Sequence, residues 1–126
     1  MYKVDTSEEM GRGLYATKPI AIFETVAVFE ILLLNPEDTV ALENTDLKFY
    51  TFRVSDVQDC LVLGDGELFN HSYKPNVIYD LIHEDNRLKM MFTAIKPIEI
   101  GEQLFIDYTA DADVDATKYI SVRSLI

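Results

Sequence analysis

The chain has 126 residues, 48% of them hydrophobic, which is enough for one compact domain with a core but not for two. Its formal net charge of −11 would repel phosphate backbones, so we expect no nucleic-acid partner. The same charge would attract a basic peptide or protein, although it is equally consistent with a role in solubility alone.

The longest uninterrupted apolar run, Ile31 to Leu34, is only as long as a strand, so we expect no membrane partner and no membrane span. Residues 1–9 lack the apolar segment of a secretory signal, and we therefore expect a cytoplasmic protein or one delivered to a host cell by another route. Cys60 is the single cysteine and cannot form an internal disulfide. Because the chain has only two histidines in addition, we predict no metal site, and we expect Cys60 to be a small buried or half-buried structural residue.

Short β-branched and aromatic runs, separated by turn residues, predict a mostly β domain. Up to residue 54 we expect a strand over 2–4, a polar turn over 5–9, strands over 25–29 and 31–34, a break at 35–38, a short helix within 39–48 and a strand over 49–54. Beyond it we expect strands over 61–63, 77–82, 88–92 and 103–106, with a longer hairpin loop at 83–87 that carries His83 on the surface. Residues 117–126 predict a closing strand or helix.

Lys-Pro-Ile occurs twice, within residues 17–22 and within residues 95–100. A proline at corresponding places excludes the middle of a helix and favours a turn, so we predict two similar β-turn-β corners.

The stretch Asn70-His71-Ser72-Tyr73-Lys74-Pro75-Asn76 is too polar for an ordinary buried strand, yet it lies between an apolar run and a β-patterned run. Such an array of donors and acceptors beside an apolar wall is typical of a site that holds a polar ligand. Gly11-Arg12-Gly13 allows close approach of the backbone to a ligand, although alone it most often marks a turn.

Four features stand in a fixed order along the chain: Gly11-Arg12-Gly13-Leu14-Tyr15-Ala16, Asn70-His71-Ser72, Pro75-Asn76, and Gly101-Glu102-Gln103-Leu104-Phe105-Ile106-Asp107-Tyr108. Together they resemble the SET-domain protein lysine methyltransferases, most of all the small stand-alone members of bacteria and viruses. The resemblance implies one SET domain over residues 1–126, with a motif-bearing core at about 10–108 and a tail at 109–126. It also implies small curved sheets, in which the segment ending at Tyr108 passes under the loop after Asn70-His71-Ser72 as a C-terminal pseudoknot.

The implied activity is S-adenosylmethionine-dependent N-methylation of a lysine on a basic protein tail, histone-like or other. The cofactor would bind on one face, and the lysine would reach it from the opposite face through a narrow channel. This transfer requires a neutral amine, an aligned approach and exclusion of water, and a nearby sulfonium in an apolar channel favours the neutral amine.

The resemblance implies a role for each matching residue. Tyr108 would be catalytic, at the inner end of the channel. The cofactor would be bound by Met10, Gly11, Arg12, Gly13, Leu68, Asn70 and His71. The channel would be lined by Tyr50, Phe105, Ile106 and Tyr108. Asp107 would be structural, at the threaded crossing. A residue of any one of these types, considered alone, more often has a structural role. Only their occurrence together, at these relative positions, indicates a functional site.

Four residues depart from the family pattern. Asp65 stands where an aromatic residue is frequent, and Glu67-Leu68 stand where the family often has Arg-Phe. Ile106 replaces a Phe or Tyr, and because it has no hydroxyl to hold a water or an amine, we predict that more than monomethylation is possible. These departures leave an alternative open, in which the chain is a SET-like protein-binding module of weak or lost activity. Homodimerisation is also plausible, because a small domain without flanking modules leaves apolar surface uncovered.

Overall fold

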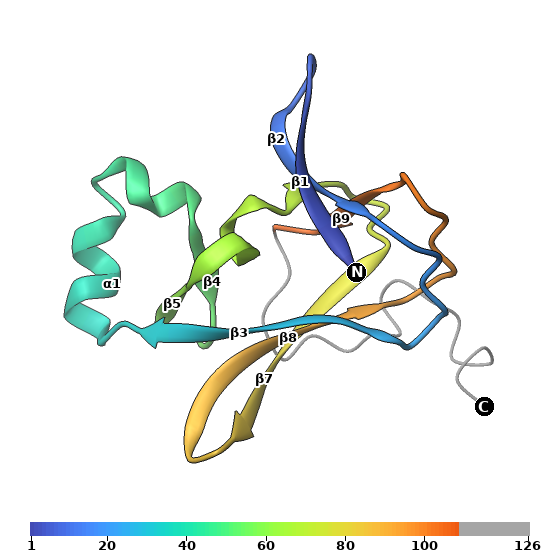
Figure 1. Cartoon of the computed structure of the whole chain (residues 1–126). Helices are drawn as coiled ribbons and strands as arrows, with labels where there is room; N and C mark the ends of the chain where they lie inside the picture. The colour runs from blue at the N-terminus through green and yellow to red at the C-terminus, as the bar shows by residue number, and fades with distance from the viewer. Residues whose placement is uncertain (109–126) are drawn as a thin grey trace.

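Two small curved sheets form the fold, which confirms the predicted mostly β class (Figure 1). The computed structural model describes residues 1–108, so the closing strand or helix predicted for 117–126 lies outside the described residues. The strand order is β1-β2-β9-β6 in one sheet and β4-β5-β3-β8-β7 in the other. The strands are β1 Tyr2–Ser7, β2 Gly11–Ala16, β3 Thr25–Leu33, β4 Thr51–Arg53, β5 Asp59–Val62, β6 Asn70–His71, β7 Val77–Glu84, β8 Arg87–Ala94 and β9 Gln103–Ile106. The helices are α1 Pro36–Leu42 and the short 3-10 helices η1 Asp46–Phe49 and η2 Gly64–Leu68.

The core lies where apolar side chains of the two sheets meet. Phe69 and Phe92 are almost fully buried there, and their rings stack with centroids 4.3 Å apart. Cys60 is buried in the same cluster, as predicted, and its burial, together with the nearby Glu67 and Asp59 carboxylates, raises the pKa of the thiol to about 12. Among residues 1–108, no helix is long and apolar enough to span a membrane.

Strands β6 and β9 form a parallel pair, with Asn70 opposite Phe105 and His71 opposite Ile106. The backbone N–H of Ser72 continues the ladder by donating to the Ile106 carbonyl at 2.9 Å. Asn76 then fixes β9 from the other side of the loop: its Nδ2 donates to the Gln103 carbonyl at 2.8 Å, and its Oδ1 accepts from the Phe105 N–H at 2.7 Å. The crossing predicted between the two distant motifs is therefore present.

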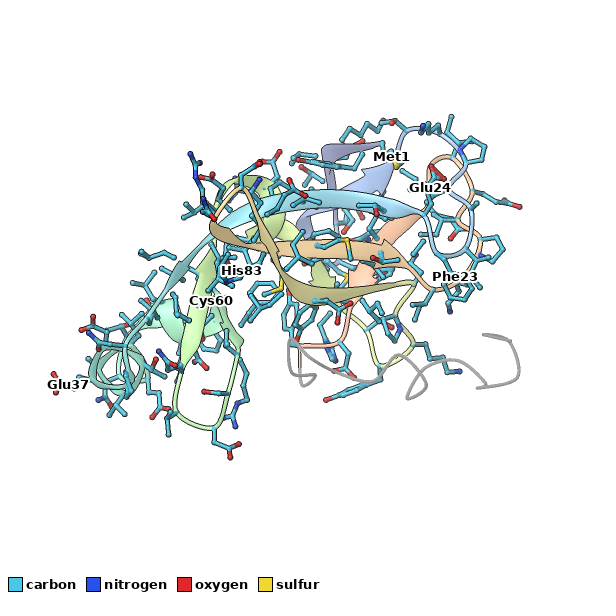
Figure 2. The ribbon with its side chains drawn as sticks, turned by 90° about the horizontal axis from the view of Figure 1, so that it is seen from below. Met1, Phe23, Glu24, Glu37, Cys60 and His83 are labelled. Carbon is cyan, nitrogen blue, oxygen red and sulfur yellow. The ribbon has the colours of Figure 1, made fainter. Side chains whose placement is uncertain are left out.

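The two Lys-Pro-Ile corners pair with each other. Ile20 and Ile98 exchange two backbone hydrogen bonds, of 2.8 Å and 2.9 Å, and both side chains are 2% exposed. This bridge ties the segment before β3 to the segment before β9. Figure 2 shows Phe23 and Glu24, which follow the first corner, at the end of the molecule opposite Glu37 on α1.

Several predicted boundaries are wrong. The helix begins at Pro36 rather than after residue 38, because Asn35 caps it by accepting from the Asp38 N–H at 2.7 Å and proline suits the first helical turn. It ends at Leu42, and η1 follows as a separate turn. The two strands predicted over 25–34 are one continuous strand, β3, and the glycine pair at 11–13 lies within β2.

The β7–β8 hairpin has a tight turn instead of the predicted longer loop. Asp85 and Asn86 have φ values of 54° and 62°, the left-handed conformations of a two-residue hairpin turn. As a result His83 is paired in β7 with Leu88, although its side chain is exposed as predicted for a surface residue.

Candidate active site

Two cavities meet beside the β6–β9 crossing. The first, of about 270 Å³, is called the aromatic cavity here and is lined by Lys48, Thr51, Phe52, Phe69 and Tyr79. The second, of about 300 Å³, is called the β2 cavity and is lined by Met10, Arg12, Tyr50, Leu68 and Asn70. Phe49, Glu67 and Tyr108 line both cavities. These three residues therefore form the boundary between a mainly aromatic space and a more polar one.

Asn70 is held rigidly against β2. Its Nδ2 donates to the Arg12 carbonyl at 3.0 Å and to Gln103 Oε1 at 2.7 Å. Both amide protons are thus used within the chain, and among the described residues Oδ1 receives no donor, so it is available to accept from a ligand. The close approach depends on Gly13, because a β carbon there would lie 2.7 Å from Nδ2.

Tyr108 is anchored at both its backbone and its hydroxyl group. Its N–H donates to His71 Nδ1 at 2.9 Å, and its hydroxyl donates to the Phe69 carbonyl at 2.5 Å. The side chain is still 53% exposed, because it faces both cavities. Partial burial raises the pKa of the phenol, and Glu67 and Tyr50 raise it further. The hydroxyl therefore stays protonated at neutral pH and acts as a fixed dipole at the cavity boundary.

His71 supports Tyr108 but lines neither of the two cavities. Its Nδ1 accepts from the Tyr108 N–H and lies 3.8 Å from an oxygen of Asp107, which is 4% exposed. Its Nε2 is buried without a hydrogen-bond partner among the described residues. Since Nδ1 is an acceptor, we assign the proton of the neutral ring to Nε2.

Glu67 is the least expected member of the boundary. Its Oε1 accepts from the Val62 N–H at 2.6 Å, whereas Oε2 is buried with no partner among the described residues. Burial raises the pKa of this carboxyl to about 7, against a smaller lowering by the Val62 hydrogen bond. Asp65, the neighbouring departure from the family pattern, lines neither cavity and instead accepts a hydrogen bond from the Tyr2 hydroxyl at 3.0 Å.

The predicted site residues are only partly brought together. Met10, Arg12, Leu68, Asn70 and Tyr50 share the β2 cavity with Tyr108. Gly11 and Gly13 flank Arg12 in β2 and do not line that cavity. Phe105 and Ile106 line neither of these two cavities, and Ile106 is 1% exposed in the core, so the idea that it controls the number of methyl groups stays a prediction.

Sequence reasoning did not assign Glu67 or most of the aromatic wall to the site. Phe49 and Phe52 were visible only as members of a strand-like alternating run. Phe69 and Tyr79 are buried core residues whose contact with a cavity has no signal in the sequence. Within residues 1–108, no cluster of three or more His, Cys, Asp or Glu residues could hold a metal ion.

Comparison with known proteins agrees with this geometry. The SET domain family model matches residues 11–109. A histone-lysine N-methyltransferase of Schizosaccharomyces pombe, specific for lysine 37 of histone H3, is 28% identical over 107 residues, which cover 84% of this chain and 71% of that protein.

Solved structures share the fold. A Plasmodium falciparum protein assigned as a histone methyltransferase superposes with a TM-score of 0.69 at 20% identity, over 87% of this chain and 94% of that one. A Polycomb Repressive Complex 2 structure in an autoinhibited conformation, bound to S-adenosylmethionine, superposes with a TM-score of 0.70 at 24% identity, over 90% of this chain and 16% of that one.

The chain therefore belongs to the SET-domain family, the class of protein-lysine N-methyltransferases. This confirms the resemblance and the enzyme class that the four ordered motifs predicted.

Proposed function

We propose that the chain transfers a methyl group from S-adenosylmethionine to the side-chain amine of a lysine in a basic protein. The observation that supports this most directly is the meeting of two dissimilar cavities at Tyr108. A methyl transfer between two bound partners requires two binding spaces with one short shared boundary.

The β2 cavity suits the cofactor. When bound, S-adenosylmethionine supplies an electrophilic methyl group carried on a sulfonium. Asn70 Oδ1 is an acceptor for the ammonium group of its methionine part, and Leu68 and Met10 offer apolar surface to the adenine. Gly13 keeps Asn70 close to β2, so a larger residue there would displace the acceptor. Gly11 remains a predicted contact, Arg12 one mainly through its backbone, and His71 one that hydrogen-bonds to the cofactor.

The aromatic cavity suits the lysine. Phe52, Phe69 and Tyr79 present apolar and π surfaces to a long aliphatic stem with a cationic head. The net charge of −11 favours approach by a basic protein tail, and the relative from Schizosaccharomyces pombe is named for a lysine of a histone. We therefore propose a histone-like or other basic protein as substrate.

Tyr108 would orient the reacting groups. Its hydroxyl is protonated and fixed by the Phe69 carbonyl, so its oxygen lone pairs are available to an amine proton at the boundary. Such a dipole is already oriented and does not rearrange during the reaction, so it can stabilise the transition state of an aligned displacement.

The alternative is a SET-like protein-binding module of weak or lost activity, motivated by the departures at Asp65, Glu67 and Ile106. Of these three residues, Asp65 and Ile106 line neither cavity, whereas Glu67 lines both. Cytoplasmic location or delivery to a host cell, and homodimerisation, stay predictions from the sequence.

Calorimetric titration with S-adenosylmethionine distinguishes the two functions. The enzyme hypothesis predicts saturable binding, together with transfer of label from the cofactor to a panel of basic proteins. Binding of basic proteins without any heat or thermal shift from the cofactor would favour the binding module.

A further inference from the structure

Glu67 lies where the resemblance has a cationic residue, so its charge is a property of this chain and not of the family pattern. It contributes to the wall of both cavities together with Tyr108 and Phe49. Only one of its carboxylate oxygens is used by the fold, at Val62 N. The other oxygen is buried and has no partner among residues 1–108.

A buried carboxylate oxygen without a donor is costly, and such groups in folded proteins are normally satisfied. Oε2 is shielded from solvent, but Glu67 contributes to the wall of both cavities, so turning its carboxyl group would present this oxygen to a group bound there. The proposed substrate brings a suitable donor, an ε-ammonium group, to that same boundary.

We propose that Glu67 accepts the proton that the target lysine must lose before methyl transfer. This inference rests on the proposed function. In the step, an N–H bond of the ammonium breaks, an O–H bond forms at Oε2, and the electron pair stays on nitrogen as the lone pair of a neutral amine. The amine is then ready to attack, and the proton later returns to solvent.

The energetics of this transfer depend on burial. An exposed lysine has a pKa of about 10.4, far above that of an exposed carboxyl, so transfer between them in water is unfavourable. Burial lowers the pKa of an amine and raises that of a carboxyl, and the carboxyl of Glu67 is already raised to about 7. In a dry cavity the pKa values of the lysine amine and the Glu67 carboxyl converge. The proton can then move to Glu67, which leaves a neutral amine beside a neutral carboxylic acid.

The surroundings of Glu67 also contain groups that could modulate its titration. The titratable and charged residues that share a cavity or an electrostatic interaction with it are Arg12, Lys48, Tyr50, Cys60 and Tyr108. The Cys60 thiol, with its pKa near 12, and the Tyr108 phenol, with its raised pKa, stay neutral below pH 8, whereas the Glu67 carboxyl, with its pKa near 7, changes charge near neutrality.

The test combines a spectroscopic and a kinetic readout. The Glu67 carboxyl is titrated by ¹³C NMR in the full chain saturated with a basic peptide that carries either a lysine or an uncharged norleucine at the target position. We expect a lower Glu67 pKa with the lysine peptide, because an adjacent ammonium favours the carboxylate. Identical titrations with the two peptides would overturn the proposal.

The kinetic arm compares wild type with Glu67→Gln, which keeps an acceptor for Val62 N–H but cannot take a proton. In wild type we expect kcat/KM to rise through an inflection near pH 7. In Glu67→Gln we expect a loss of at least about a hundredfold at pH 7.5 and no such inflection. Asp65→Asn, on the same 3-10 helix but outside both cavities, should keep the wild-type profile.

The two hypotheses fail in different ways. If wild type transfers methyl groups and Glu67→Gln has the same pH profile, the proton-acceptor role is wrong and the proposed function stands. If wild type transfers no label to any basic protein at any pH, the proposed function is wrong, and this role falls with it.

Discussion

A β carbon on Gly13 would lie 2.7 Å from Nδ2 of Asn70, which is closer than unbonded atoms tolerate. The same added carbon would lie 2.5 Å from Gln103 Oε1, the acceptor that holds Asn70 in place. The absence of a side chain at position 13 is therefore a condition for the geometry of the proposed cofactor cavity.

Gly13→Ala should weaken S-adenosylmethionine binding by at least about tenfold, because Asn70 and Gln103 must move to make room. Isothermal titration calorimetry measures the change. Gly101→Asn is a matched control, since Gly101 has open space around it and a φ of +86°, which asparagine tolerates best among residues with a side chain. An unchanged dissociation constant in Gly13→Ala would show that Asn70 does not set the affinity.

Asn76 should contribute more to stability than any exposed asparagine. It is 6% exposed and makes two hydrogen bonds to the backbone of β9, so Asn76→Ala leaves the Phe105 N–H and the Gln103 carbonyl unpaired. We expect a loss of about 2–4 kcal/mol in the free energy of unfolding, measured in urea. Asn44→Ala, at an exposed position, should lose less than about 0.5 kcal/mol. Equal losses in the two variants would contradict the anchoring role of Asn76.

Glu67 should make stability depend on pH in a defined direction. Its pKa is raised in the folded state from an ordinary 4.5 to about 7, so the folded chain binds this proton more tightly than the unfolded chain. The stabilisation is therefore complete below pH 4.5 and is lost as the pH rises toward 7. The melting temperature of wild type relative to Glu67→Gln should fall across this window and stay constant above it. A constant difference from pH 4 to pH 8 would mean that the carboxyl has an ordinary pKa.

Asp65 should act on stability without affecting cofactor binding. It accepts a hydrogen bond from the Tyr2 hydroxyl, and burial, followed by this contact, raises the pKa of that phenol to about 12. Asp65→Ala and Tyr2→Phe should each cost about 1 kcal/mol, and the double variant little more than either one. A double-mutant cycle in urea, with cofactor titration of each variant, tests this. Weaker cofactor binding in Asp65→Ala alone would restore the idea that position 65 shapes the cofactor site.

The class of fold could be predicted because the strand runs are β-branched and bounded by turn residues. Strand β6 could not, because its two residues become a strand only by pairing with Phe105 and Ile106. The start of α1 was misread because Asn35-Pro36 can mark either a chain break or a capped helix, and only the Asp38 N–H contact shows which one applies.

The motifs place Arg12, Asn70 and Tyr108 together beside the β2 cavity, and their role in a site stays a prediction. Phe105 and Ile106 were both assigned to the channel, although neighbouring residues of a strand point to opposite faces. Ile106 indeed lies in the core, on the same side of β9 as the buried Leu104. Glu67 could not be assigned, because its burial depends on the Val62 N–H, a tertiary contact that no local pattern encodes.

The most direct test of the account is transfer of labelled methyl groups from S-adenosylmethionine to basic proteins by wild type and by Tyr108→Phe, with cofactor affinity measured in parallel. We expect wild type to label a lysine, and Tyr108→Phe to bind the cofactor equally well while losing at least about a hundredfold in turnover. Equal turnover in the two proteins, or no cofactor binding by wild type, would contradict the claim that the two cavities meet at a catalytic phenol.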